Sequence, residues 1–365
     1  MTMIALQRPF TRFDGVQLLR FLASAMVLVA HATIYTDERL GKGVPIWRVG
    51  GAGVDIFFVI SGFVIVLASR GRGKDAWVGW QSFLARRGLR IFPMYWLATL
   101  VNLAIFFILP GAVLHSKLEI GDILQWFLLV PTYNSDGRIE PLIGVAWTLY
   151  FETFFYALFA LSLYLRRSPF AVVAPILLVC AATSLLRRPG WPPIAVYLDP
   201  KVLEFLIGML IAASKDRLTN HPNGGALTAA IGVVLMLNFG AIGGLLEFVV
   251  RATASAMIVG GTVALESRLA GRVGKPLLFL GAASYAIYLI HPLVVPAVPM
   301  LLRKLGMVNA TLSVVGCIAV GLVIPAIVYH WAEKPILAAG SAWLRARTGS
   351  DARRSISSEI ADGAS

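Results

Sequence analysis

The sequence predicts an all-α integral membrane protein that crosses the bilayer about ten times. Of its 365 residues, 58% are hydrophobic and only 14% are charged, whereas soluble domains carry about 25% charged residues. Apolar runs of about 17–25 residues, the length that crosses a bilayer as a helix, recur along the chain. The lysines and arginines gather in short clusters between these runs. A soluble core of this size could not bury so much apolar surface.

The predicted spans run from the N-terminal region to near residue 332. They lie near residues 16–35, 53–69, 90–109, 143–165, 170–187, 200–214, 226–241, 243–265, 277–301 and 311–332. The apolar piece Ile123–Val130 is too short to cross a bilayer and predicts a re-entrant or interfacial segment. Residues 1–340 are therefore expected to form one membrane domain. Residues 341–365 are expected to be a polar cytoplasmic tail, disordered towards its end.

The positive charge of the chain fits a membrane protein better than a nucleic-acid-binding protein. Basic residues exceed acidic residues by 32 to 19, a net charge of +13. If both termini are cytoplasmic, about 20 of the 32 basic residues lie on the inner side, as the positive-inside rule requires. Arg187, Arg188, Arg303 and Lys304 count against this orientation. The distribution predicts a multi-pass membrane protein with both termini in the cytosol, in contact with anionic lipid.

Four ionisable side chains fall within predicted spans, in the half of the membrane away from the termini. They are His31, Asp55, Glu152 and His291. An ionisable group in a span is costly unless it faces a partner or a wet cavity, so each is a functional candidate. Together they predict a site in the outer half of the membrane.

Helical spacing aligns several of the polar residues. Arg20 and His31 share one helix face about 16 Å apart along the axis. Two further stripes at helical spacing are Ser284, Tyr288 and His291, and Thr148, Glu152 and Tyr156. These patterns predict one polar passage that reaches both halves of the membrane.

Basic residues at the start of the third span have the geometry for phosphate recognition. Arg87 and Arg90 lie one helical turn apart, with Arg86 adjacent. Two guanidinium groups on one face can hold a phosphate, although positive-inside anchors would look the same. At the inner end of the last span, Glu333 and Lys334 are expected to form a structural interface pair.

The other candidates also have structural explanations. Asp55 could cap the second span, Glu152 could pair with a basic residue, and His291 could bond to a neighbouring helix. His31 is the hardest to explain structurally, because no apolar packing role needs an imidazole in line with Arg20. The glycines within residues 50–53 most simply allow two backbones to approach closely.

Six motifs occur in order along nearly the whole chain. They are Arg20 and His31 with ten residues between them, GGAGVDIFFVISGF at 50–63, FLARRGLRIFPMYW at 83–96, WTLYFETFFY at 147–156, SYAIYLIHP at 284–292 and HWAEKP at 330–335. Together they resemble the membrane acyltransferase-3 family. The second and fourth motifs look most like the subgroup that acetylates exopolysaccharides.

The resemblance implies a ten-helix enzyme that takes an acyl group, usually acetyl, from cytoplasmic acyl-CoA. The acceptor is a sugar hydroxyl, on a polysaccharide or a lipid-linked oligosaccharide at or beyond the outer face. The family's essential histidine matches His31, its paired arginine matches Arg20, and its inner-face RxxR motif matches Arg87 and Arg90. No metal is expected. Polysaccharide export machinery and a second copy of the chain are further candidate partners.

The residues and the resemblance lead to one mechanistic hypothesis. Its catalytic residues are His31, Arg20, Glu152 and Asp55, its donor-binding residues are Arg86, Arg87 and Arg90, and its acceptor-binding residues are Ser284, Tyr288 and His291. The histidine of the first span acts as a general base or forms an acyl-histidine. One of the two carboxylates orients that imidazole. The acceptor-binding stripe could also stabilise an oxyanion.

Three other functional classes compete with this hypothesis. A transporter or flippase is the main rival, since buried carboxylates and histidines also form proton relays, but the sequence shows no paired halves. A zinc site from His31, Asp55, Glu152 and His291 would have suitable ligand types, but not a metal-binding spacing. A non-enzymatic subunit of an export complex is the third.

Overall fold

The computed structural model describes residues 13–41, 43–70, 77–108, 120–188 and 190–346. These residues are mostly helical and form no strand; two isolated β-bridges join Arg70 to Trp77 and Tyr133 to Ile139. The elements in chain order are α1 (Asp14–Leu40), η1 (Arg48–Ala52), α2 (Gly53–Ser69), α3 (Trp80–Ile108), α4 (Ile120–Leu128), η3 (Gly144–Ala146), α5 (Trp147–Tyr164), α6 (Pro169–Ser184), η4 (Pro193–Tyr197), α7 (Val202–Ala213), α8 (Lys215–Thr219), α9 (Pro222–Phe239), α10 (Gly244–Ala264), α11 (Glu266–Leu269), α12 (Lys275–Ala282), α13 (Ser284–Val294), α14 (Ala297–Lys304), α15 (Ala310–Val328) and the π-helix η5 (Tyr329–Glu333).

Eight helical segments of the described chain are long and apolar enough to cross a membrane. They are Asp14–Leu40, Arg48–Ser69, Trp80–Ile108, Gly144–Tyr164, Pro222–Phe239, Gly244–Ala264, Ser284–Lys304 and Ala310–Ala346. Each overlaps a predicted span. The chain is therefore an all-α, polytopic membrane protein, as the sequence predicts.

The two remaining predicted spans, near 170–187 and 200–214, are helical but shorter than predicted. α6 has 16 residues and α7 has 12. At 1.5 Å per residue, α7 rises about 18 Å, which is less than the roughly 30 Å of the hydrocarbon core. α7 instead packs backbone to backbone on α2, because a Cβ at Gly208 would meet the carbonyl oxygen of Val59. α7 is a largely buried helix that is too short to cross the bilayer by itself.

Two other sequence predictions concern shorter segments. The apolar piece Ile123–Val130 lies mainly in α4, whose nine residues are too few to cross a bilayer. The last helix continues through η5 to Ala346, so the first residues of the predicted tail are helical. Residues 347–365, where disorder is predicted, lie outside the described part of the chain.

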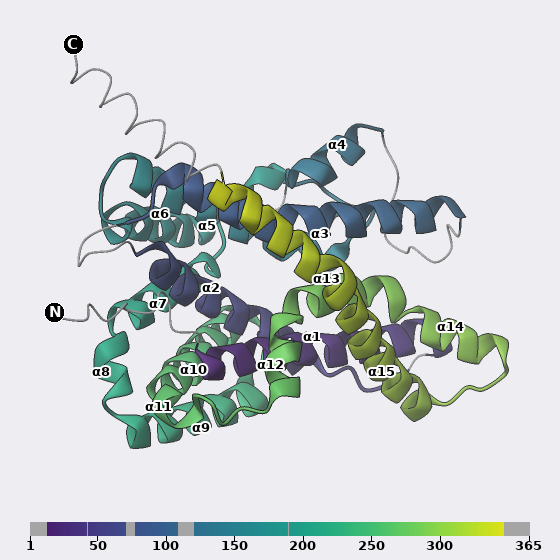
Figure 1. The fold of residues 1–365 in the computed structure, drawn as a ribbon. Helices are drawn as coiled ribbons and strands as arrows, with labels where there is room; N and C mark the ends of the chain where they lie inside the picture. Colours follow the sequence, from purple (N-terminus) through teal and green to yellow (C-terminus); the bar gives the residue numbers. More distant parts are fainter. Residues whose placement is uncertain (1–12, 42, 71–76, 109–119, 189, 347–365) are drawn as a thin grey trace, which may run out of the picture.

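α1 lies at the centre of the bundle and packs against α2, α10, α12, α13 and α15 (Figure 1). A Cβ at Gly50 or Gly53 would meet the carbonyl oxygens of Met26 and Ala23, respectively. The start of α2 therefore lies directly on α1, and the close approach predicted for residues 50–53 is confirmed.

The N-terminus of α1 is fixed by a side chain from a distant part of the sequence. The Glu266 carboxylate accepts hydrogen bonds from the backbone N–H groups of Asp14 at 2.7 Å and Gly15 at 3.0 Å. It therefore satisfies two of the donors that a helix N-terminus leaves unpaired. Burial raises the pKa of the Glu266 carboxyl above its ordinary value, and the two N–H groups oppose that shift. This contact anchors the helix that carries Arg20 and His31.

Stacked aromatic rings hold α2, α5 and α7 together. The Phe58 and Phe205 rings lie 4.7 Å apart between centroids, and the Phe155 and Phe205 rings lie 4.6 Å apart. Such pairs combine large apolar burial with a specific geometry. With the helices held in this way, the Ser61 hydroxyl donates a 3.2 Å hydrogen bond to the Glu152 carboxylate.

Candidate active site

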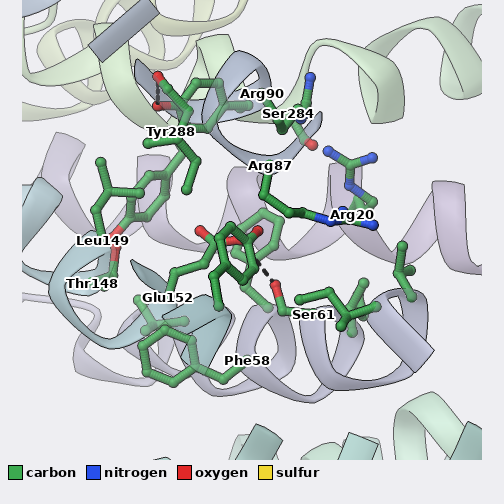
Figure 2. Close-up of a pocket in the computed structure, with 18 residues that line it drawn as sticks. Arg20, Phe58, Ser61, Arg87, Arg90, Thr148, Leu149, Glu152, Ser284 and Tyr288 are labelled. Carbon is green, nitrogen blue, oxygen red and sulfur yellow. Dashed lines mark hydrogen bonds between the residues drawn. The ribbon is translucent and has the colours of Figure 1, made fainter. Parts of the chain in front are cut away.

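A cavity of about 140 Å³, which we call the arginine cavity, lies between α1, α2, α3, α5 and α13 (Figure 2). Its polar lining residues are Arg20, Ser61, Arg87, Arg90, Thr148, Glu152, Tyr156, Ser284, Tyr285 and Tyr288. Figure 2 shows Arg20, Arg87, Glu152 and Ser61 around this space, which they reach from α1, α3, α5 and α2, respectively. Three guanidinium groups face one carboxylate, so the cavity has the charge to bind an anion.

Aromatic rings orient two of these guanidinium groups. The Cζ atom of Arg87 lies 5.7 Å from the Phe83 ring centroid and 5.8 Å from that of Tyr156. The Cζ atom of Arg90 lies 5.3 Å from the Tyr285 ring centroid. Cation–π contacts of this kind hold a guanidinium plane without neutralising its charge.

The three arginines differ in their acidic partners. Arg90 forms an ion pair with Glu333, a fully buried carboxylate in the π-helix η5. In the described part of the chain, neither Arg20 nor Arg87 forms an ion pair with a carboxylate. Their charges can therefore be used to bind an anionic ligand.

A second cavity, of about 690 Å³, has His31 in its wall, and we call it the histidine cavity. Its other polar lining residues include Tyr35, Glu38, Asn102, Asn134, Arg138, Glu140, Lys201, Arg251, Tyr288 and Lys304. The mixture of amide, carboxylate, cationic and aromatic groups matches what a polyhydroxylated ligand needs for hydrogen bonding and ring packing.

The two cavities follow each other along the same helices. On α1 the lining passes from Arg20 in the arginine cavity to His31 in the histidine cavity, and on α13 it passes from Ser284 to Pro292. Val54 and Tyr288 line both cavities. The sequence predicts one continuous passage, whereas the structure has two chambers that meet at these two side chains.

His31 lies against a second imidazole. The Nδ1 atom of His31 is 3.0 Å from the Val27 carbonyl oxygen and 3.3 Å from Nε2 of His291. The Nδ1 atom of His291 is in turn 2.8 Å from the Ile287 carbonyl oxygen. A carbonyl oxygen only accepts, so these partners assign a proton to Nδ1 of both neutral rings. Nε2 of His31 is then unprotonated and can act as a base or a nucleophile.

Glu152 and Asp55, the predicted orienting carboxylates, do not contact His31. Glu152 lies in the arginine cavity, where it accepts hydrogen bonds from Ser61 and Tyr156. Asp55 is fully buried and forms an ion pair with Lys201. The structure thus corrects the prediction that all four ionisable groups form one site: of the four, the two histidines contact each other, and Asp55 and Glu152 have other partners.

Three other predicted binding residues lie elsewhere than expected. Arg86 is exposed and lines neither described cavity. Ser284 lines the arginine cavity, away from His31. His291 is fully buried and contacts His31 instead of lining the space for an acceptor. Among the predicted acceptor-binding residues, only Tyr288 reaches the histidine cavity.

Arg251 belongs to this region of the structure and is absent from the sequence prediction. Its guanidinium group lies 3.7 Å from Asp55 and 2.8 Å from Glu247. Arg251 falls in the middle of the predicted span 243–265, so the rule that singled out Glu152 also applies to it. The sequence prediction names Glu333 only as a structural partner of Lys334. Its ion pair with Arg90 is harder to predict, because it joins residues 243 positions apart.

Asp55 is expected to contribute to stability. The Asp55→Asn substitution removes the charge that balances Lys201 and Arg251 in a buried setting, which is costly. We expect the melting temperature of the detergent-solubilised protein to fall by at least about 3 °C. Asp216→Asn is the matched control, because the Asp216 side chain is 88% exposed. Equal melting temperatures for the two variants would contradict the structural role.

A sequence model described as an acyltransferase domain, Acyl_transf_3, matches residues 13–330. The chain belongs to this acyltransferase family. It is therefore an acyltransferase with a polytopic helical fold. The resemblance to this family seen in the sequence is confirmed.

Three curated relatives are similar to this acyltransferase. The exopolysaccharide production protein ExoZ of Rhizobium meliloti is 32% identical over 81% of the chain and 92% of its own length. YrhL of Bacillus subtilis, provisionally named a peptidoglycan O-acetyltransferase, is 28% identical over 80% of the chain and 52% of its own length. Acyltransferase MdmB of Streptomyces mycarofaciens is 28% identical over 53% of the chain and 55% of its own length. No solved structure matches the chain.

Proposed function

We propose that this acyltransferase moves an acetyl group from acetyl-CoA to a hydroxyl of an exported polysaccharide or of its lipid-linked precursor. The observation that carries the proposal is the placement of two cavities in line, one rich in arginine and the other with His31 in its wall. A polyanionic donor and a neutral, polar acceptor need chambers that differ in this way. The similarity to ExoZ, a protein of exopolysaccharide production, supports the choice of acceptor.

The donor is expected to enter on the arginine side. Arg20, Arg87 and Arg90 would hold the phosphates of the coenzyme, with Glu333 keeping Arg90 in place. The pantetheine arm then extends towards His31, over the axial distance of about 16 Å between Arg20 and His31. The positive-inside bias puts the arginine cavity towards the cytosol, where acyl-CoA is made, with both termini on that side of a bacterial inner membrane.

The proposed chemistry uses the unprotonated Nε2 atom of His31. Nε2 removes the proton of the acceptor hydroxyl as its oxygen attacks the thioester carbonyl carbon. A C–O bond forms, the C–S bond breaks, and the coenzyme thiolate leaves and takes the proton back from the imidazolium. The products are the ester and free coenzyme thiol. The acyl-histidine alternative uses the same Nε2 atom as a nucleophile.

In this scheme His291 positions the imidazole of His31. Two substitutions of His291 can distinguish this positioning role from a role in packing alone. His291→Gln can keep an acceptor near Nε2, so it keeps the partner of Nδ1 of His31. His291→Asn keeps a donor near Nδ1, so it keeps the local bond to Ile287. We expect the asparagine variant to lose at least about tenfold in kcat with little change in KM for acetyl-CoA, and the glutamine variant to lose less.

The shape of the pH–rate profile provides a further readout for this pair. A positioning partner of the base changes the pH at which kcat falls on the acid side, whereas a packing defect only lowers the amount of active protein. If both variants lose activity equally and keep the wild-type pH profile, His291 has only a packing role.

The cell provides the direct test of the proposed function. Polysaccharide is isolated from cells with and without the gene, and from cells that carry the His31→Ala variant, and its O-acetyl groups are counted by NMR. We expect O-acetylation only with the wild-type gene. Unchanged acetylation in the deletion strain would overturn the acceptor assignment. Substrate transport by purified protein without consumption of acetyl-CoA would favour a flippase.

A further inference from the structure

A third cavity, which we call the tryptophan groove, lies beside the histidine cavity. Arg138, Glu140 and Trp147 line both of them. The tryptophan groove has a volume of about 970 Å³, which by itself is at the upper end of the range of about 300–1,000 Å³ for small-molecule sites. A ligand longer than one sugar therefore has room to extend from the histidine cavity into this groove.

Two loops, one before α5 and one after α6, form much of the groove wall and are joined by a hydrogen bond. The Tyr133 hydroxyl donates to the Trp191 carbonyl oxygen at 2.6 Å. Within the first loop, the Asn134 side chain accepts hydrogen bonds from the backbone N–H groups of Asp136 at 3.0 Å and Arg138 at 2.9 Å. These bonds form the wall before any ligand binds, which lowers the entropic cost of binding.

Three aromatic residues, Tyr133, Trp147 and Trp191, line the tryptophan groove. Tyr133 is 46% exposed, so its ring can be covered by a ligand. Trp147 packs edge-on against Phe151 at 5.6 Å between centroids, which holds its ring where the two cavities meet. A sugar ring packs its apolar C–H face on an aromatic ring and keeps its hydroxyls free for polar groups. Such a lining suits a carbohydrate chain.

A pair of adjacent arginines, Arg187 and Arg188, also lines the groove. Both are exposed, and in the described part of the chain neither forms an ion pair with a carboxylate. In the predicted orientation they lie on the outer side, against the positive-inside rule, whereas Arg166 and Arg167 at the other end of α6 obey it. A guanidinium group can bind a carboxylate through two parallel hydrogen bonds. Arg187 and Arg188 therefore have the chemistry to bind an acidic ligand.

The carboxylates of the groove have partners of their own. Glu140 lies 3.8 Å from Arg138, and Asp199 accepts a 2.9 Å hydrogen bond from the backbone N–H of Lys201. The arginine pair beyond α6 therefore remains available for negative charges on a ligand.

We propose that the tryptophan groove binds the part of an acidic acceptor chain that extends beyond the reacting sugar. The reacting sugar lies in the histidine cavity and can itself be uncharged. Neighbouring sugar rings pack on Trp147 and Trp191, and carboxylates on those sugars bind to Arg187 and Arg188. This inference rests on the proposed function, and it specifies the acceptor as a chain with acidic groups.

The dependence of acceptor binding on chain length tests the groove. Unacetylated polysaccharide from the deletion strain is hydrolysed into pools of short and long fragments, and acetyl transfer by purified enzyme is measured across fragment concentrations. We expect KM of the wild type to be at least about tenfold lower for the long pool. Trp191→Ala should raise KM for the long pool to the value for the short pool, with kcat and KM for acetyl-CoA unchanged.

Trp80→Ala is the matched control for the tryptophan variant. Trp80 is also partly exposed and lines none of the three cavities. It should keep the wild-type dependence on length. A wild-type KM that does not depend on length, or a folded Trp191→Ala variant that keeps the dependence, would overturn the groove as the binding site of the chain.

The Arg187→Ala/Arg188→Ala double variant tests the recognition of acidic groups. Both side chains are exposed, so this test stays decisive if Trp191→Ala does not fold. Part of the long pool is chemically reduced so that its carboxyl groups become hydroxyls. We expect the double variant to raise KM for the untreated pool by about tenfold and to leave KM for the reduced pool unchanged. Arg166→Ala/Arg167→Ala, the matched pair at the other end of α6, should behave like the wild type with both pools.

Two outcomes separate the failure of this inference from the failure of the proposed function. If the double variant raises KM equally for the untreated and reduced pools, the arginines do not bind carboxylates of the chain, and a contact with lipid headgroups is favoured. If the wild-type enzyme acetylates neither fragment pool, the proposed acceptor is wrong, and the groove assignment is wrong with it.

Discussion

Replacing His31 by alanine is expected to reduce acyl transfer by at least about a hundredfold and to leave a folded, membrane-inserted protein. Nε2 of His31 is a basic atom in the wall of the histidine cavity, and no residue in the described part of the chain forms a hydrogen bond with it. Without it, the acceptor hydroxyl would have to lose its proton to water, and the attack on the thioester would slow accordingly. The measurement is the rate of acetyl transfer at saturating donor, together with size-exclusion and thermal-melting profiles of the purified variant.

His221→Ala is the matched control for this prediction. His221 is exposed and lies at the start of α9, and it lines neither described cavity. We expect its rate to equal that of the wild type. A folded His31→Ala variant with full activity would contradict both roles for this imidazole, the base and the nucleophile.

Arg87→Ala is expected to raise KM for acetyl-CoA by about 10- to 100-fold with a smaller effect on kcat. A hydrogen bond to a charged group contributes about 1.5–3 kcal/mol, and Arg87 has no carboxylate partner in the described structure that its loss would leave unpaired. The effect on KM therefore reports donor binding and not an internal rearrangement. Initial rates across a range of acetyl-CoA concentrations measure it.

Arg86→Ala makes the same chemical change one residue earlier. The sequence alone treats the two arginines alike, but the structure puts Arg86 on the exposed face of α3 and Arg87 in the cavity. We expect the Arg86 variant to keep the wild-type KM. If KM for acetyl-CoA rises equally in the Arg86→Ala and Arg87→Ala variants, general positive charge, and not the arginine cavity, attracts the donor.

Most of the fold could be predicted from the sequence, because a bilayer requires long apolar helices and these are visible as apolar runs. Two predicted spans form helices shorter than expected, and α7 shows why. Residues 200–214 are apolar enough for a span, but Gly208 allows α7 to pack directly on the backbone of α2. Hydrophobicity alone does not distinguish a helix buried in protein from one in contact with lipid.

The parts of the site that depend only on the spacing of residues along one helix could be predicted from the sequence. Spacing along the first span predicts that Arg20 and His31 face the same side, and the structure gives each of them a cavity. Contacts between helices were not predictable, since the pairing of Glu333 with Arg90 and of Asp55 with Lys201 depends on tertiary packing.

The central claim is that an acyl group passes from a donor on the arginine side to an acceptor on the histidine side. Membrane vesicles that expose the cytoplasmic face, with acceptor polysaccharide enclosed in the lumen, test it most directly. Acetyl-CoA labelled in the acetyl group is added outside, and the label on the lumenal polysaccharide is counted. The account predicts label with the wild-type protein and none with the His31→Ala variant. Label found only on acceptor outside the vesicles, or equal lumenal label with both proteins, would contradict it.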